Sequence, residues 1–225
     1  MLSSQDGLTA MQARAMRRIL IVDDHAVVRD GVKRILNPQA GKIFFGEASS
    51  PQEAFKLARK HEWDAVVLDL SLGGRSGLEV LIELKQIRPR LPVLILSMHS
   101  EEQYARRAFK AGAAGYITKN SPRAELIRAV NKVIEGGRYV TSALAEKLIL
   151  DIERGGDRPP HESLSNREFE VMALIASGRT ISEIADQLSL SDKTISTYRA
   201  RLLVKMGMKT SAELTHYAIQ NKLVD

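Results

Sequence analysis

The chain has 225 residues, a formal net charge of +6 at pH 7 and no cysteine. Its length allows one large domain or two modest ones, and a hydrophobic share of 44% is enough for a packed core, which excludes a wholly disordered chain. The absence of cysteine excludes disulfide scaffolds, thiolate metal sites and cysteine nucleophiles, and it fits the reducing cytoplasm where we expect this protein.

The first residues predict neither a signal peptide nor a membrane anchor. Residues 1–16 lack an apolar stretch and are expected to form a disordered tail, with Met11 or Met16 as alternative starting residues. No apolar run reaches the roughly 18–20 residues that a transmembrane helix needs, so no membrane partner is expected.

Short apolar runs alternate with amphipathic segments in residues 17–140. Strands are predicted at 18–23, 43–48, 64–69, 92–97 and 115–118, and helices near 26–36, 51–61, 76–87, 101–111 and 122–135. Capping signals mark three helix starts: Ser50 with Glu53, Ser100 with Gln103, and Ser121 before Pro122. This alternation predicts an α/β domain with a five-stranded parallel sheet and helices on both of its faces.

The remaining residues predict a second, smaller domain. Residues 141–163 contain one further helix at 142–153 and a linker rich in glycine, proline and charge at 154–163. Residues 164–225 are expected to form an all-α domain of four short helices at about 165–177, 180–188, 191–206 and 210–220. The capping residues at their starts are Ser165 with Glu168, Thr180 with Glu183, Ser191, and Thr210 with Glu213.

Polar residues follow the predicted strands of the first domain. Asp23 and Asp24 end the first strand, Asp69 the third, Ser97 the fourth, and Thr118 with Lys119 the fifth. The carboxyl ends of parallel strands share one edge of a sheet, so these side chains are expected to converge there. Clustered carboxylates repel one another, and a hard divalent cation such as Mg²⁺ relieves that repulsion. Asp69 is central and is the best candidate for covalent phosphorylation, with Lys119 to hold a phosphoryl oxygen.

Residues 17–135 resemble the receiver domain of response regulators, which has a flavodoxin-like (βα)5 fold, because these acids, the hydroxyl and the lysine follow the strands in the same order. The resemblance implies that Asp69 accepts the phosphoryl group and that Asp23, Asp24, Asp69 and the Ser71 backbone carbonyl bind Mg²⁺. It also implies that Lys119 contacts the phosphoryl group, and that Ser97 and Tyr116 are switch residues that respond to it. One departure is Leu72-Gly73-Gly74, where the family often has Met-Pro-Gly.

A helix-turn-helix is predicted in the second domain, with helices at Thr180–Leu188 and Ser191–Met206 and a turn at Ser189-Leu190. In the second helix, one face carries the apolar residues Ile195, Tyr198, Leu202 and Met206 and is expected in the core. The opposite face carries small, polar or basic residues that suit the DNA major groove: Lys193, Ser196, Thr197, Ala200 and Arg201. The net charge of the second domain gives no evidence for DNA binding, because residues 161–225 hold eight basic and eight acidic side chains. Residues 17–140 hold 21 basic and 14 acidic side chains.

The segment SEIADQLSLSDKTISTYRARLLVKMG (182–207) resembles the LuxR-type helix-turn-helix, and the whole chain resembles NarL/FixJ-family response regulators. The family often has histidine at the position of Tyr198, which faces the core here. The resemblance implies that Lys193, Ser196, Thr197, Ala200 and Arg201 contact DNA, with Arg199 and Lys205 near phosphates. It also implies dimerisation through the last helix, with Leu214, Tyr217 and Ala218. Packing within the domain is the alternative explanation of these three residues.

The resemblance as a whole implies a transcription factor. A sensor histidine kinase would phosphorylate Asp69, and the modified chain would bind double-stranded DNA as a homodimer. Such a receiver is not an enzyme, because it promotes only its own phosphotransfer and dephosphorylation. Two other classes remain open from the residues. A Mg²⁺-dependent phosphatase or phosphotransferase would share the acidic pocket, and a protein-interaction module would fit a helical domain without net charge.

Overall fold

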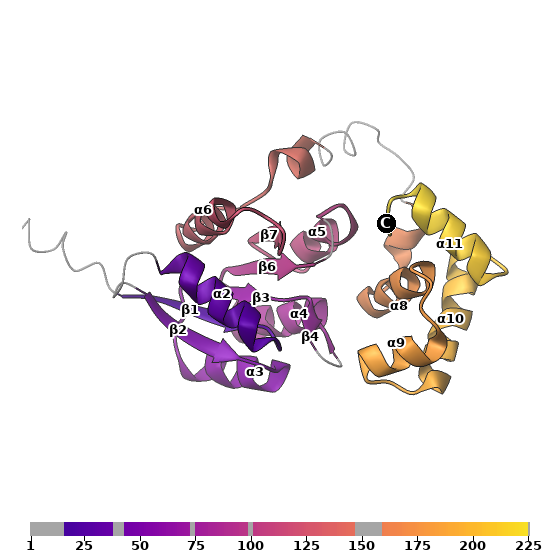
Figure 1. Cartoon of the computed structure of the whole chain (residues 1–225), viewed down its shortest axis with the longest axis horizontal. Helices are drawn as coiled ribbons and strands as arrows, with labels where there is room; N and C mark the ends of the chain where they lie inside the picture. The colour runs from indigo at the N-terminus through magenta and orange to yellow at the C-terminus, as the bar shows by residue number, and fades with distance from the viewer. Residues whose placement is uncertain (1–15, 38–42, 73–74, 99–100, 147–158, 225) are drawn as a thin grey trace, which may run out of the picture.

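The structure, a computed structural model, describes residues 16–37, 43–72, 75–98, 101–146 and 159–224. In these residues an α/β domain is followed by a helical domain (Figure 1). The predicted tail at 1–15, residues 147–158 of the predicted helix and linker, and the predicted cap Ser100 lie outside the described residues, whereas residues 142–146 are helical as expected. None of the helices described is long and apolar enough to cross a membrane.

The α/β domain is built on a five-stranded parallel sheet, as predicted. Its strands are β1 (Arg17–Val22), β2 (Ile43–Ala48), β3 (Ala65–Leu68), β6 (Val93–Ser97) and β7 (Gly115–Thr118), in the order β2-β1-β3-β6-β7. All neighbouring pairs in this order are parallel. The chain moves from β1 outward to β2 and then returns to β3 on the other side of β1. The carboxyl ends of β1 and β3 therefore flank the switch point where open α/β sheets bind ligands.

Helices cover both faces of the sheet (Figure 1). One face packs against α2 (Ala26–Leu36) and α6 (Arg123–Ile134), and the other packs against α3 (Pro51–Lys60), α4 (Gly77–Ile87) and α5 (Glu101–Lys110). Alternate residues of each strand feed the two cores: Ile19 and Ile21 point to the first face, and Leu20 and Val22 to the second. Because both faces are covered, the strands are continuous apolar runs and hold their polar residues at the ends.

The second domain has the four predicted helices, α8 (Asn166–Ala176), α9 (Ile181–Leu188), α10 (Asp192–Met206) and α11 (Ser211–Gln220). The capping boxes of Ser165 with Glu168 and of Thr180 with Glu183 are both formed. Ser191 accepts a hydrogen bond from the backbone N–H of Thr194 and so begins α10. At the other end, Gly207 takes the left-handed conformation (φ 65°), which glycine adopts without the strain of a side chain.

A small hairpin and a 3-10 helix were not predicted. Strands β4 (Ser71–Leu72) and β5 (Arg75–Ser76) form a small antiparallel hairpin in the loop that follows β3. A 3-10 helix, η1 (Pro160–Ser163), lies where a linker was expected, and it leads directly into α8.

At α6 the predicted cap is wrong, and at α11 the cap forms as predicted but without the reciprocal bond of a capping box. Helix α6 begins at Arg123 with Pro122 as its N-cap residue, and the Ser121 hydroxyl lies 3.1 Å from the Thr118 hydroxyl instead of capping the helix. At α11 the Thr210 side chain accepts from the Glu213 N–H as expected, but the Glu213 carboxylate accepts from the backbone of Lys209, which leaves the capping box incomplete.

Candidate functional site

The acids and the lysine predicted at the strand ends converge at one edge of the sheet. Asp23 follows β1, Asp69 follows β3 and Lys119 follows β7, and they come from positions far apart in the sequence. The ammonium of Lys119 donates to Oδ2 of Asp69 at 2.6 Å and to Oδ2 of Asp23 at 2.8 Å. A single cation therefore holds one oxygen of each of these two acids.

The charges in this pocket are balanced by direct contacts between Lys119 and the two acids. Burial alone would lower the pKa of Lys119, but its hydrogen bonds to Asp23 and Asp69 outweigh burial and raise that pKa. Burial raises the pKa of Asp69, and the hydrogen bond from Lys119 opposes this rise. The contacts of Lys119 with the two acids therefore favour its charged form, and they oppose the effect of burial on the pKa of Asp69.

One oxygen of Asp69 is not paired with a donor or a cation by the described residues. Asp69 is only 2% exposed, and its Oδ1 atom is buried without a hydrogen-bond partner among the described residues. A buried carboxylate oxygen without a donor is costly, and a cation would remove that cost. The acids around it supply the oxygen ligands that Mg²⁺ prefers. The residues present thus fit the predicted metal ion.

His25 belongs to the same cluster, although the sequence did not single it out. Ligand atoms of Asp23, Asp24, His25 and Asp69 all lie within 4.8 Å of one another. The imidazole Nδ1 lies 2.7 Å from Oδ1 of Asp24 and 3.3 Å from Oδ1 of Asp23. Its only signal in the sequence is its place directly after the two aspartates.

The predicted switch residues lie on β6 and β7, two of the strands that end at this pocket. Ser97 is the last residue of β6 and is completely buried, and Tyr116 on the neighbouring strand β7 is also completely buried. Ser97 pairs with Thr118 in the sheet register, one residue before Lys119. Ser71, whose carbonyl was predicted as a metal ligand, begins β4 two residues after Asp69. The predicted receiver residues are therefore gathered around one end of the sheet, and their individual roles stay predictions.

Gly77 is a further residue on which the pocket depends, and sequence reasoning missed it. A Cβ atom at Gly77 would lie 2.4 Å from the Cα of Leu70 and 2.6 Å from the carbonyl oxygen of Asp69. Both are backbone atoms, so they cannot move aside as a flexible side chain would. The first residue of α4 must be glycine for the helix to pack this closely on the backbone that carries Asp69.

Gly77→Ala is expected to destabilise the receiver by about 1–3 kcal/mol, as overpacking does, and to slow labelling of the chain by acetyl phosphate. The measurement is urea unfolding followed by fluorescence of Trp63, the one tryptophan of the chain. Gly31→Ala on α2 is the control, because nothing lies within 4 Å of its added methyl group. That variant should be stabilised by about 0.5–1 kcal/mol through helix propensity. Equal urea concentrations at the unfolding midpoint of the two variants would contradict the close packing at Gly77.

The predicted DNA-reading face of α10 is open. Ile195, Leu202 and Met206 are buried and Tyr198 packs against the core, as the periodicity predicted. The opposite face is exposed along its length and carries Lys193, Ser196, Thr197, Ala200 and Arg201. These side chains form a continuous polar and basic strip that nothing in the described part of the chain covers.

The flanking basic residues differ from expectation in their surroundings. Lys205 donates to Oε2 of Glu168 on α8 at 2.7 Å, so a phosphate contact would need it to leave that ion pair. Arg199 donates to the Ser211 hydroxyl at 2.9 Å and remains exposed. Asp192 lies in the first turn of α10 and opposes a phosphate at that helix start.

The three residues predicted to dimerise are engaged within the chain. Leu214 and Ala218 have no exposed surface, and Tyr217 is half-buried with its hydroxyl 2.8 Å from Nδ1 of His161. Packing within the domain, the alternative explanation, accounts for all three positions. The large apolar side chain of α11 that is exposed is Ile219, at 54%. A dimer through α11 stays a prediction, and it would have to use this outer face.

The two domains meet where α5 of the receiver packs against η1 and α8. Arg107 donates to the carbonyl oxygens of Leu164 at 2.8 Å and of His161 at 2.5 Å, and its guanidinium lies 4.1 Å from the centre of the Phe169 ring. Arg106 and Lys110 both pair with Glu162. Burial lowers the pKa of Arg107 to about 10, so it stays charged at neutral pH. One face of a receiver helix thus holds the start of the second domain.

The comparisons with known proteins agree with this architecture. The response regulator receiver domain matches residues 19–131, and the luxR family of bacterial regulatory proteins matches residues 162–218. The response regulator UvrY of Escherichia coli is 37% identical over 209 residues, which cover 92% of this chain and 96% of that protein.

Two solved structures are similar as well. A LuxR-family response regulator from Aurantimonas sp. SI85-9A1 shares 36% identity over 61% of this chain and 98% of its own, with a TM-score of 0.56. RcsB from Salmonella enterica serovar Typhimurium, solved bound to promoter P1flhDC in the presence of the phosphomimetic BeF3⁻, shares 25% identity over 90% of this chain and 98% of its own, with a TM-score of 0.57. Proteins of this kind are DNA-binding regulators of transcription and not classical enzymes. The chain belongs to the NarL/FixJ-type two-component response regulators, with a receiver domain and a LuxR-type DNA-binding domain.

Proposed function

We propose that a sensor histidine kinase phosphorylates Asp69 of this regulator in the cytoplasm, and that phosphorylation changes how the chain dimerises and binds specific double-stranded DNA. The observation that carries the proposal is the buried pocket in which Lys119 holds one oxygen of Asp69, while the other oxygen has no hydrogen-bond partner within the described part of the chain. This arrangement suits a carboxylate that gains a phosphoryl group and a metal ion together.

The residues of the pocket would have different roles in phosphoryl transfer. Asp69 forms the new bond to phosphorus as the bond from phosphorus to the donor breaks, and Lys119 offers its charge to the phosphoryl oxygens. Asp23 and Asp24, with the Ser71 carbonyl, would hold Mg²⁺, which when bound neutralises the charge of the transferred group. The hydroxyl of Ser97, at the end of β6, would donate a hydrogen bond to the phosphoryl group.

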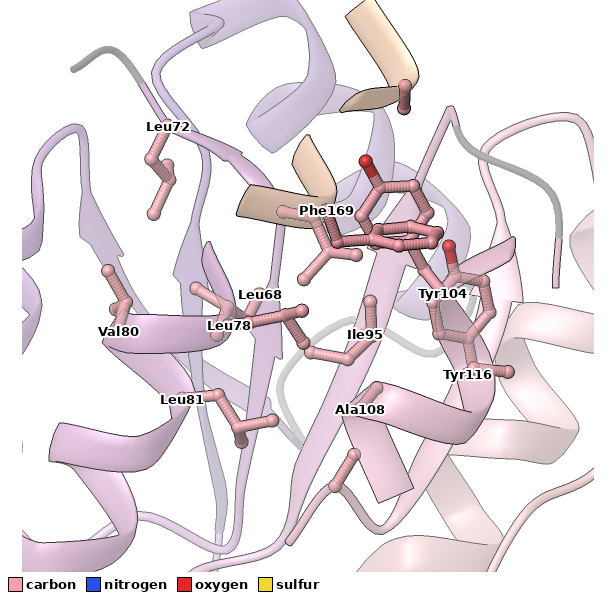
Figure 2. Packing of buried hydrophobic residues seen from close by; sticks show 14 of the residues in the cluster. Leu68, Leu72, Leu78, Val80, Leu81, Ile95, Tyr104, Ala108, Tyr116 and Phe169 are labelled. Carbon is pink, nitrogen blue, oxygen red and sulfur yellow. The ribbon is translucent and has the colours of Figure 1, made fainter. Parts of the chain in front are cut away.

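A packed route leads from this pocket to the DNA-binding domain. Tyr116 on β7 pairs with Ile95 of β6, two residues before Ser97, and it belongs to the same buried cluster as Tyr104 of α5. The Tyr104 ring packs edge-on against Phe169 of α8, with 5.2 Å between the ring centres. Figure 2 shows these aromatic side chains gathered where the receiver meets the second domain. We infer that a shift of Tyr116 on phosphorylation moves α5 and thereby changes the contacts of α5 with η1 and α8.

In this docked arrangement the receiver does not control DNA binding by covering the reading face of α10. Its contacts fall on η1 and α8, whereas Lys193, Ser196, Thr197, Ala200 and Arg201 are exposed. His161 of η1 also contacts Tyr217 of α11, the helix expected to dimerise. Release or movement of η1 would therefore act on how two chains pair on DNA, and not on access to a single helix.

The test compares DNA affinity with and without beryllofluoride and Mg²⁺, using duplex DNA selected from a random pool by the chain itself. The wild-type affinity should change by about tenfold, a typical coupling between two sites. Arg107→Ala removes the contacts of this guanidinium with η1 and α8, so the ratio of the two affinities should fall toward one while acetyl phosphate still labels the chain. Arg128→Ala, an exposed change on α6, should leave the ratio unaltered.

The two parts of this proposal fail separately. A wild-type ratio of one would contradict phosphorylation-controlled DNA binding itself. A wild-type ratio retained in Arg107→Ala would leave that function in place and contradict the route through α5.

A further inference from the structure

His25 faces the phosphorylation pocket, yet the phosphotransfer chemistry above leaves it without a role. Its side chain is 68% exposed, so the imidazole is reachable from solvent, and its Nδ1 atom is turned toward Asp23 and Asp24. The backbone N–H of His25 donates to Oδ1 of Asp23 at 2.8 Å, which fixes the start of α2 against that carboxylate. The imidazole is thus held beside the acids by the chain itself.

The spacing of these atoms suits neighbouring ligands of one ion. In an octahedral shell with bonds of about 2.1 Å, adjacent ligand atoms lie about 3.0 Å apart. Nδ1 of His25 lies 2.7 Å from Oδ1 of Asp24 and 3.3 Å from Oδ1 of Asp23, on either side of that value. When the imidazole carries its proton on Nε2, the lone pair of Nδ1 is free to join them.

A second observation points to a cation at the same place. Lys119 binds Oδ2 of both Asp23 and Asp69, whereas Oδ1 of Asp23 accepts the backbone N–H of His25 and keeps a second lone pair for a cation. Oδ1 of Asp69 is buried and has no hydrogen-bond partner among the described residues. The ligand atoms of these two acids, of Asp24 and of His25 lie within 4.8 Å of one another.

We propose that His25 supplies an imidazole nitrogen to the divalent ion in this pocket, so that the receiver binds ions that favour imidazole, such as Fe²⁺, Ni²⁺ and Zn²⁺, more tightly than its oxygen ligands alone would. Mg²⁺ prefers oxygen ligands and gains little from the imidazole, whereas these transition ions gain a favourable ligand. The inference rests on the metal pocket of the proposed function. It implies that the supply of metal ions decides which ion meets the phosphoryl group.

The experiment is calorimetric titration of the untagged full chain with Ni²⁺ and, separately, with Mg²⁺. His25→Ala should weaken Ni²⁺ binding by about tenfold or more and change Mg²⁺ binding by less than about twofold. Mg²⁺ should compete with Ni²⁺, because both occupy one pocket. His216→Ala, an exposed histidine on α11, is the matched control and should change neither affinity.

X-ray absorption on the Ni²⁺-loaded chain provides a readout that does not depend on affinity. Imidazole scattering should be present in the wild type and in His216→Ala, and absent in His25→Ala. If both ions bind but Ni²⁺ binding and its scattering are unchanged in His25→Ala, the role of His25 is wrong and the Mg²⁺ pocket stands. If neither ion binds the wild type, the pocket and the role of His25 are both wrong.

Discussion

Asp69→Asn is expected to abolish labelling of the chain by radioactive acetyl phosphate. Asparagine has the same shape, so the pocket should remain folded, but its amide is not a nucleophile and carries no charge for Lys119 to hold. The expected loss is on the order of 10³-fold or more in labelling rate, since no chemistry remains at this position. Mass spectrometry of the intact chain measures the effect as the missing phosphoryl mass.

Asp64→Asn is the matched control for this variant. Asp64 lies at the opposite end of β3 and is exposed, and its carboxylate accepts the backbone N–H of Arg18. Labelling of Asp64→Asn should equal that of the wild type. Label that persists in Asp69→Asn on a different residue would show that the acceptor has been assigned to the wrong aspartate.

The second large effect is expected on the open face of α10. The double variant Lys193→Ala, Arg201→Ala removes the two basic residues of the predicted reading face, and both are exposed. Each change should cost about 1–3 kcal/mol of DNA-binding free energy, so the double variant should bind selected DNA on the order of 10²-fold more weakly or worse. Fluorescence anisotropy at several salt concentrations measures this loss.

The salt dependence separates the kinds of contact. A residue that binds phosphate lowers the slope of log affinity against log salt by about 0.9, whereas a base contact leaves that slope nearly unchanged and relaxes sequence preference. The control is Arg128→Ala, Lys132→Ala, which removes the same charge from the exposed side of α6. If both double variants weaken binding equally, the effect is one of overall charge and α10 is not the reading helix.

The receiver pocket could be predicted from the sequence because the parallel topology of the sheet determines where the strand ends lie. Once the strands are placed, their carboxyl ends must meet at one edge, and Asp23, Asp69 and Lys119 do meet there. The inner face of α10 was predictable for a similar reason, since the helical period alone brings Ile195 and Leu202 to the core.

Features that depend on close packing could not be predicted in this way. The need for glycine at position 77 arises from a backbone approach that no periodicity records. The place of His25 depends on the direction of one side chain at a helix start. The contact of Arg107 with η1 and Phe169 depends on two surfaces that fit each other, and one of these lies in a segment whose composition predicted a linker.

The α11 residues show the limit of pattern reasoning most clearly. A helix that packs in its own domain and a helix that pairs with a second chain both carry an apolar stripe, so the sequence did not separate the two. The structure places Leu214 and Ala218 in the core and leaves Ile219 exposed. The stripe that the sequence reveals most strongly is the one that the domain already uses.

The measurement that tests the central claim most directly is the reciprocity of the two sites in one chain. The affinity of the receiver for beryllofluoride and Mg²⁺ is measured with and without selected DNA, beside the affinity for DNA with and without beryllofluoride. If the acidic pocket and α10 are energetically coupled, both affinities change by the same factor. An affinity for beryllofluoride that DNA leaves unaltered would contradict the claim that phosphorylation of this pocket governs DNA binding.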